Sequence, residues 1–158
     1  MSNSIFSKRK NHDINVLKES NFKLNLDDID YNIIIVQFLG PKESLYKNGI
    51  WDIRIELPKE YPYKSPSIGF LNKIYHPNVD FRSGTICLDV INETWSPMYN
   101  LFNIIDIFLP QLLLYPNPDD PLNIKASDEM INNMELFISN VDENINKFAK
   151  SESNINYN

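Results

Sequence analysis

Apolar and polar positions alternate most clearly over residues 49–57, where every second residue from Trp51 onward is large and apolar and the residues between are charged. This period of two predicts a strand with one buried face and one solvated face. Weaker segments of the same kind at 22–26, 31–39 and 67–71 predict three further strands. Because the connections between them are short, we expect the strands to pair in order as a four-stranded antiparallel meander.

The two ends of the chain show helical spacing instead. Residues 8–20 predict an N-terminal helix with a basic start, and residues 100–114 predict a second helix that Pro110 should kink or break in its last turn. Two more helices are expected after it. In the last one, apolar residues recur at alternating steps of four and three and predict a core-facing stripe of Met134, Ile138, Val141, Ile145 and Phe148. Strands and helices that are segregated along the chain indicate an α+β fold.

Residues 75–99 show neither period and are rich in residues that favour turns. We expect an irregular segment here. Long ordered stretches without regular structure often carry function, so this segment is where an active site is expected.

Length and composition fit a single globular domain. The chain has 158 residues and 18.5 kDa, which predicts one domain over 1–158 with an ordered core at about 7–150 and short flexible ends. Lys and Arg number 15 against 21 Asp and Glu, a net charge of −6, so we expect no nucleic-acid partner. No stretch approaches the roughly 18 apolar residues of a membrane span, and the N-terminus lacks the apolar run of a secretory signal.

The lone cysteine, Cys87, excludes an internal disulfide and fits a reducing compartment, so we expect an intracellular protein. We also expect a monomer, located in the cytoplasm, the nucleus or both. Cys87 is also the strongest nucleophile candidate; the plainer alternative is a buried, inert thiol. A hydrolase would need an imidazole beside it, but His76 precedes a proline, which fixes its backbone. The acidic neighbours Asp89, Asp119 and Asp120 disfavour the thiolate form, which points away from amide cleavage and toward exchange with another thioester.

Other chemistry has little support in the sequence. It contains no Cys/His cluster with the spacing of a metal site and no glycine-rich phosphate loop. We therefore expect neither a metal nor a bound cofactor.

Several short motifs stand in a specific order and spacing: Tyr-Pro-Tyr-Lys-Ser-Pro at 61–66, His-Pro-Asn at 76–78, Gly-Thr-Ile-Cys-Leu-Asp at 84–89, Trp-Ser-Pro at 95–97, and Tyr-Pro-Asn-Pro-Asp-Asp-Pro-Leu at 115–122. Together they resemble the ubiquitin-conjugating enzymes, and the resemblance covers about residues 8–149. Residues 64–74, 87–92 and 108–113 look most like the H-type, or yeast UBC8-like, subclass. That subclass is associated with histone ubiquitylation and the GID/CTLH ligase assembly. A long acidic C-terminal tail is usual in it, whereas residues 151–158 carry little charge.

The resemblance implies the UBC fold and a thioester mechanism without a cofactor, because ATP is used by the upstream activating enzyme. Cys87 would accept ubiquitin from that enzyme and pass it to a substrate lysine. Asn78 would steady the oxyanion or hold the active-site loop, the plainer alternative being turn structure alone. His76 would be structural and bond local backbone. Asp120 would orient the incoming lysine and Asp89 would gate the same groove, the alternative being solvated loop residues.

Two further sets of residues match partner-binding surfaces of the family. The set that contacts RING-type ligases in relatives is Tyr63, Ser96, Pro97 and Met98. The set that helps to dock the activating enzyme is Lys8, Arg9 and Lys10. The alternatives are that Tyr63 and Met98 are simply packed and that the basic set is a solvated helix end.

Two other functions remain open at this point. The same chemistry could serve a SUMO-like or NEDD8-like modifier, or the chain could be a non-catalytic binding module of the related RWD type. Such modules lack the nucleophile, which this chain has in Cys87.

Overall fold

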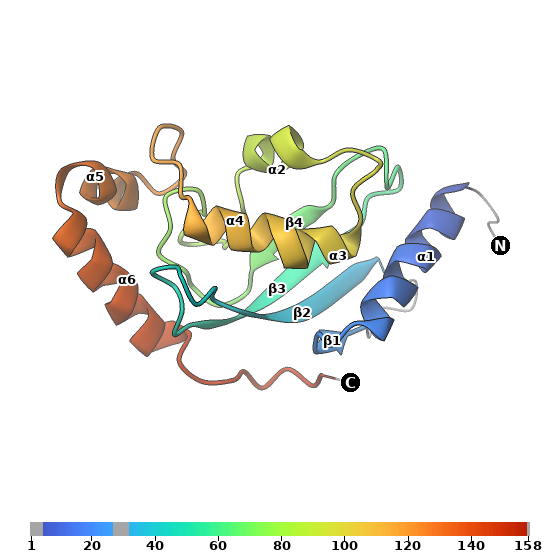
Figure 1. Cartoon of the computed structure of the whole chain (residues 1–158), viewed down its shortest axis with the longest axis horizontal. Coiled ribbons are helices and arrows are strands. Elements are labelled where there is room, and N and C mark those ends of the chain that lie inside the picture. Colours follow the sequence, from blue (N-terminus) through green and yellow to red (C-terminus); the bar gives the residue numbers. More distant parts are fainter. Residues whose placement is uncertain (1–4, 27–31, 158) are drawn as a thin grey trace.

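The computed structural model describes residues 5–26 and 32–157. The chain begins with one helix, continues through four strands, and ends with helices (Figure 1). The elements are α1 (Ile5–Glu19), β1 (Leu24–Asn25), β2 (Ile33–Leu39), β3 (Ile50–Glu56), β4 (Ser67–Phe70), α2 (Leu88–Thr94), α3 (Leu101–Asn103), the π-helical turn η1 (Ile104–Phe108), α4 (Leu109–Leu114), α5 (Ile124–Asn132) and α6 (Met134–Phe148). This order confirms the α+β prediction.

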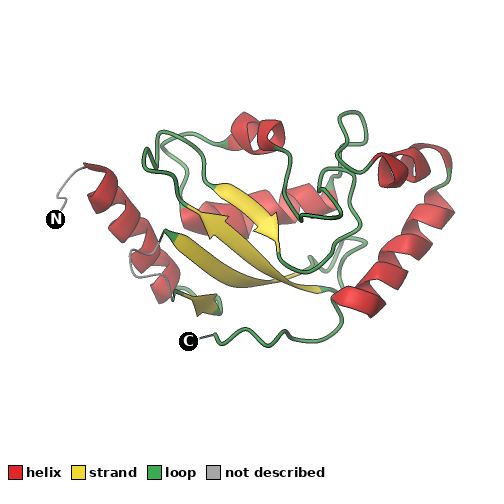
Figure 2. Cartoon of the chain, turned by 180° about the vertical axis from the view of Figure 1, so that it is seen from behind, coloured by secondary structure: helices red, strands yellow, loops and turns green. Residues whose placement is uncertain are grey.

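The sheet is the predicted antiparallel meander, with its strands in the order β1-β2-β3-β4. Inward-facing side chains pair directly across β2 and β3, as in Val36 opposite Ile53 and Phe38 opposite Trp51. All four of these side chains are buried. The helical run from α3 to α4 covers this inner face, while α1 and α6 stand at the two ends of the sheet (Figures 1 and 2).

The helical run across the sheet continues through Pro110, so of the predicted kink or break in its last turn the break does not occur. The irregularity lies one turn earlier, in η1, where the Leu109 N–H donates to the Ile104 carbonyl five residues back. A proline cannot donate to the preceding turn and its ring crowds the carbonyl four residues back. A π turn just before the proline accommodates both effects, because it widens the helix there.

The core-facing stripe predicted for α6 is partly wrong. Val141 and Ile145 are buried, and Phe137, outside the predicted stripe, is fully buried. The other three residues of the stripe are exposed: Met134 to 44%, Ile138 to 37% and Phe148 to 37%. Among the described residues, the buried side chains of α6 also include the polar Asn144, whose amide donates to the Lys73 carbonyl at 3.0 Å. The stripe predicted from apolar residues alone differs from the buried face of α6, because that face includes the polar Asn144.

The segment 75–99, expected to be irregular throughout, contains the helix α2 directly after Cys87. The helix is seven residues long and its N-cap has no side-chain hydrogen bond. Too few turns are present to display a helical period in the sequence, which is why the pattern did not show it.

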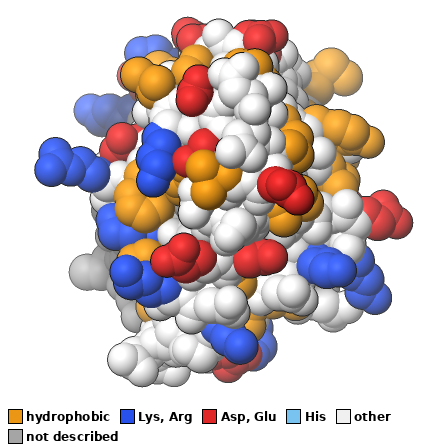
Figure 3. Space-filling model, turned by 90° about the vertical axis from the view of Figure 1, so that its left-hand side faces the viewer, with side chains coloured by type: hydrophobic (Ala, Val, Ile, Leu, Met, Phe, Trp, Pro, Cys, Tyr) orange, Lys and Arg blue, Asp and Glu red, His pale blue; other side chains and the backbone are white. Residues whose placement is uncertain are grey.

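The other face of the sheet is crossed by residues 151–157, expected as a flexible end, which the structure places along β1 to β3 (Figure 2). At the α5 and α6 end, acidic, basic and apolar side chains are interspersed over the surface (Figure 3). No helix in the described ranges is both long enough and apolar enough to cross a membrane.

Candidate active site

Cys87 is positioned by a stretch of backbone that is tied to β4 on one side. The Gly84 carbonyl accepts the Phe70 N–H at 2.8 Å, and the Ile86 N–H donates to the Ile68 carbonyl at 3.2 Å. Gly84 has a φ of 76°, and a Cβ there would lie 1.9 Å from the Phe70 carbonyl oxygen. Only glycine fits this position, so it fixes the path by which the chain reaches Cys87.

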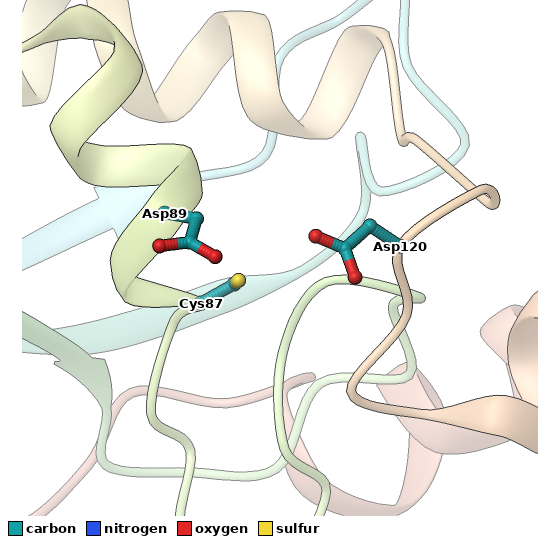
Figure 4. A group of neighbouring side chains, drawn as sticks. All are labelled: Cys87, Asp89 and Asp120. Carbon is teal, nitrogen blue, oxygen red and sulfur yellow. The ribbon is translucent and has the colours of Figure 1, made fainter.

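The thiol lies at the surface beside two carboxylates. Cys87 is half-buried at the start of α2, and Asp89 and Asp120 are exposed. The Cys87 sulfur and one oxygen of each carboxylate all lie within 4.8 Å of one another. Figure 4 shows that the sulfur points toward the loop that carries Asp120, while Asp89 stands on the helix beside it. The prediction that the cysteine is presented rather than packed is consistent with this placement.

Asn78 is fully buried, and its side chain holds the loop that bears Asp120. Its Nδ2 donates to the Asn117 carbonyl at 2.8 Å and to the Asp120 carbonyl at 3.4 Å, and its Oδ1 accepts the Asn117 N–H at 2.8 Å. Its backbone carbonyl accepts the Cys87 N–H at 3.1 Å. One residue therefore connects both sides of the site.

His76 is a structural residue, as the family resemblance implies. It is fully buried, its Nε2 bonds the Leu112 carbonyl at 2.8 Å, and its Nδ1 accepts the Asn78 N–H at 2.9 Å. The second bond requires an unprotonated Nδ1, so the proton resides on Nε2. Burial lowers the pKa of His76 to about 4, so the ring is neutral near pH 7.

The loop 115–123 has further backbone ties. The N–H groups of Leu122 and Asn123 donate to the Pro77 carbonyl at 2.8 and 3.0 Å, and the Ser127 hydroxyl donates to the Pro118 carbonyl at 2.5 Å. Asp120 is therefore an exposed side chain on a firmly held backbone.

The residues expected to contact a ligase lie on two loops that the structure joins. Tyr63 is 59% exposed and Met98 is 92% exposed, so the alternative that they are packed is wrong. The Trp95 indole N–H donates to the Pro62 carbonyl at 2.8 Å and links the loops. Ser96 and Pro97 are also exposed.

The three basic residues of α1 do not form one exposed patch. Lys8 is exposed, but Lys10 donates to Asn32 Oδ1 at 3.1 Å, and the Arg9 side chain is only 24% exposed. The Arg9 guanidinium donates to the carbonyls of Pro97 and Tyr99, in the loop expected to contact a ligase.

Arg9 is held in turn by buried partners. Its Nε lies 2.9 Å from the carboxylate of Asp13, which is 1% exposed, and the Tyr61 hydroxyl donates to the same carboxylate. The guanidinium carbon also lies 5.8 Å from the Tyr61 ring centre. Sequence reasoning missed this cluster, although the Arg9–Asp13 spacing of four residues on a predicted helix was a signal for the ion pair.

The cluster of Cys87, Asp89 and Asp120 could offer three ligand atoms to a cation. It combines one soft sulfur with two hard, exposed carboxylates, unlike the sulfur and imidazole sets of structural zinc sites. Exposed carboxylates are common without an ion, and the arrangement is a surface thiol with two acidic neighbours.

Comparisons with known proteins agree with the geometry. The sequence profile of the ubiquitin-conjugating enzymes matches residues 7–145. The chain is 52% identical over 146 residues to ubiquitin-conjugating enzyme E2-23 kDa of Triticum aestivum, covering 92% of this chain and 79% of the relative. It is 48% identical over 140 residues to ubiquitin-conjugating enzyme E2-24 kDa of Saccharomyces cerevisiae, covering 89% and 64%.

A solved structure shows the same fold. The crystal structure of a candidate ubiquitin conjugating enzyme from Plasmodium yoelii superposes with a TM-score of 0.84 at 27% identity, covering 96% of this chain and all of that one. The similarity to the yeast and plant proteins confirms the predicted likeness to the UBC8-like subclass. Matching profile, relatives and fold together show that the chain belongs to the ubiquitin-conjugating enzyme family.

Proposed function

We propose that this ubiquitin-conjugating enzyme carries ubiquitin as a thioester on Cys87 and transfers it to a substrate lysine. The observation that carries the proposal is the surface thiol of Cys87 between the carboxylates of Asp89 and Asp120. In the first step the Cys87 sulfur attacks the activating enzyme's thioester carbonyl. A new carbon–sulfur bond forms, the old one breaks, and the activating enzyme's thiol leaves.

In the second step a lysine amine attacks the thioester carbonyl. An isopeptide bond forms, the bond to the Cys87 sulfur breaks, and the amine loses a proton while the thiol is regenerated. Asp120 stands where its carboxylate can orient the amine and receive that proton. Asp89 lies on the other side of the sulfur and narrows the path by which the lysine amine reaches the thioester.

Asn78 serves this reaction by holding the loop. Both polar atoms of its side-chain amide are already bonded to the backbone of residues 117–120, and the residue has no exposed surface. A direct bond to an oxyanion would require these bonds to be given up. The geometry therefore favours the loop-holding role over the oxyanion role.

The partners proposed are ubiquitin, the activating enzyme, a RING-type ligase of the GID/CTLH kind, and protein lysines. The support is the family membership, the likeness to the yeast relative, and the exposed loops around Tyr63 and Met98. We also propose that the chain acts as a monomer in the cytoplasm or nucleus and that ATP is used only by the activating enzyme.

A charging assay tests the proposal. Ubiquitin, its activating enzyme and ATP should give an adduct that reductant removes, and Cys87→Ser should give either no adduct or one that resists reductant. Retention of the adduct by Cys87→Ala would show that the site assignment is wrong. Charging with a SUMO-like or NEDD8-like protein, each with its own activating enzyme, and not with ubiquitin would assign a different modifier.

Discharge of pre-charged enzyme to free lysine tests the role of Asn78. Asn78→Ala should slow discharge by about 10- to 100-fold, because the Asp120 loop loses its position, while charging changes much less. Asn132→Ala is the matched control, since the Asn132 side chain bonds the exposed Asp128 carboxylate within α5, outside the loop that bears Asp120. Equal losses in charging and discharge for Asn78→Ala would contradict a role confined to the second step.

A further inference from the structure

Residues 151–157, here called the strap, cross the face of the sheet that faces away from the α3 to α4 helical run (Figure 1). We propose that this outer face is a binding site for an extended peptide and that the strap occupies it in this chain. The inference is independent of the thioester chemistry, and it goes beyond the proposed function.

The strap begins at a fixed point. The Ala149 carbonyl accepts the Ile50 N–H at 2.8 Å, and the Phe148 carbonyl accepts a hydrogen bond from Asn72 Nδ2 at 3.0 Å. Ala149 itself is fully buried. The end of α6 is therefore fastened to the start of β3, and the chain leaves it directly onto the sheet.

The first contact of the strap is with a cross-strand row of polar side chains. The Gln37 N–H bonds the Lys23 carbonyl at 3.0 Å, and Gln37 lies opposite Asp52 in the register of β2 and β3. Glu152 of the strap lies 3.1 Å from Lys23 Nζ and also bonds the Gln37 side chain. These two contacts lower the pKa of Glu152, the larger effect being its bond to Lys23.

The second contact is with the next row on the same face. Asn25 lies opposite Ile35, and its Nδ2 donates to the Asn156 carbonyl at 2.8 Å. This hydrogen bond involves only a backbone carbonyl of the strap and no side chain of it. An extended segment of other sequence could therefore make it as well.

The third contact returns to the first row and involves a buried charge. The Tyr157 hydroxyl donates to the Asp52 carboxylate. The alternation of β3 predicts that Asp52 faces solvent, yet it is only 4% exposed. A buried carboxylate is costly without a hydrogen-bond donor, and the Tyr157 phenol supplies one.

These contacts define the ligand that the face accepts: an extended peptide with an acidic side chain for Lys23 and Gln37, followed by a phenol for Asp52. Burial and the bond to Asp52 raise the pKa of Tyr157, which keeps the phenol protonated as a donor. Any polypeptide of this chemistry that approaches the outer face has to displace the strap first.

Backbone dynamics of the full chain test whether the strap is bound. NMR order parameters of residues 151–157 should be near the roughly 0.85 of rigid backbone, and Tyr157→Ala should lower them below about 0.6. Asn154→Ala is the matched control, because Asn154 is exposed and should leave the values unchanged. Low order parameters in the unmodified chain, or a strap that stays rigid in Tyr157→Ala, would overturn the proposal.

Binding in trans tests the peptide site itself. A synthetic peptide of residues 151–158 is titrated into the full-length Tyr157→Ala variant and into the unmodified chain, and amide shifts at Gln37, Asp52 and Asn25 are followed. A short tether supplies an effective concentration of the order of mM, so a strap that is mostly bound requires a trans dissociation constant of a few mM or lower. We expect saturable shifts in the variant and an apparent affinity at least about tenfold weaker in the unmodified chain.

The same titration has two overturning outcomes. Absence of shifts in the variant at peptide concentrations above that limit would show that the face does not bind the segment. Equal shifts in both proteins would show that the strap does not occupy the site. A peptide with phenylalanine in place of Tyr157 should bind more weakly than the unmodified peptide, and equal binding would remove the Asp52 contact from the proposal.

Discussion

At the scale of single residues, buried polar side chains position the exposed reactive ones. Asn78 and His76 have no exposed surface, yet they connect the backbone on both sides of Cys87 and Asp120. The motifs singled out the exposed residues of the candidate site and indicated that His76 is structural. The number of bonds that Asn78 makes could not be read from the sequence, because its partners lie about 40 residues away.

His76 predicts a loss of stability in acid. Its pKa is about 4 in the folded chain against 6.5 ordinarily, so the unfolded chain binds a proton more readily between those pH values. The free energy of unfolding should be highest above pH 6.5 and should lose up to about 3 kcal/mol from this residue as the pH falls through 6.5 toward 4. Denaturant unfolding at a series of pH values measures this slope. His76→Gln should flatten it, and an unchanged slope in that variant would contradict the prediction.

Arg9 predicts a defect that is specific to ligase action. Arg9→Lys keeps the charge but cannot hold Asp13 and two carbonyls at once, so the 96–99 loop should lose its position. Ligase-stimulated discharge should fall by about 10-fold, while charging and ligase-free discharge change little. Lys8→Arg, on the exposed side of the same helix, is the control and should behave normally. A selective charging defect in Arg9→Lys would instead assign Arg9 to the activating enzyme.

At the scale of elements, the strands followed the sequence pattern more closely than the helices did. Two-residue alternation is a direct consequence of one buried sheet face, and β3 shows it over its whole length except at Asp52. The helices depended on features that a period does not encode. The π turn accommodates the proline that follows it, and the helix α2 has too few turns to display a helical period.

Gly84 predicts that the backbone segment leading to Cys87 does not tolerate one added methyl group. Gly84→Ala should lower the free energy of unfolding by at least about 2 kcal/mol, because of its positive φ and the clash with the Phe70 carbonyl. Charging of Cys87 should slow as well. Gly69→Ala, whose Cβ would only make ordinary contact at 3.4 Å, is the matched control. Thermal unfolding and charging rates measure both effects, and equal effects of the two variants would contradict the assignment.

At the scale of the whole molecule, the fold class and strand order were predictable from the sequence. The side-chain hydrogen bonds that fasten distant elements to one another were not. Asn72 illustrates the reason: it bonds the Asp52 N–H, the Ile50 carbonyl and the Phe148 carbonyl, and so fastens α6 to the sheet. Its partners come from two distant elements. An asparagine before a lysine carries no sequence signal for such a role.

Asn72→Ala should therefore weaken the whole fold without altering the chemistry. Loss of three hydrogen bonds, with their backbone partners left half-buried, should cost about 2–3 kcal/mol of unfolding free energy. Charging of Cys87 should stay normal at temperatures where the variant is folded. Asn132→Ala, which removes one exposed side-chain bond to Asp128, is the control and should cost little. Normal stability of Asn72→Ala would show that α6 is held by its apolar side chains alone.

The hydrogen bonds from Arg9 to the Pro97 and Tyr99 carbonyls have an evolutionary consequence. The guanidinium holds main-chain carbonyls, which every residue type supplies, and it makes no demand on the identity of Ser96 or Met98. Those side chains can change over generations while the loop keeps its shape. Partner preference can thus drift by single substitutions at the proposed ligase surface while its geometry is inherited intact.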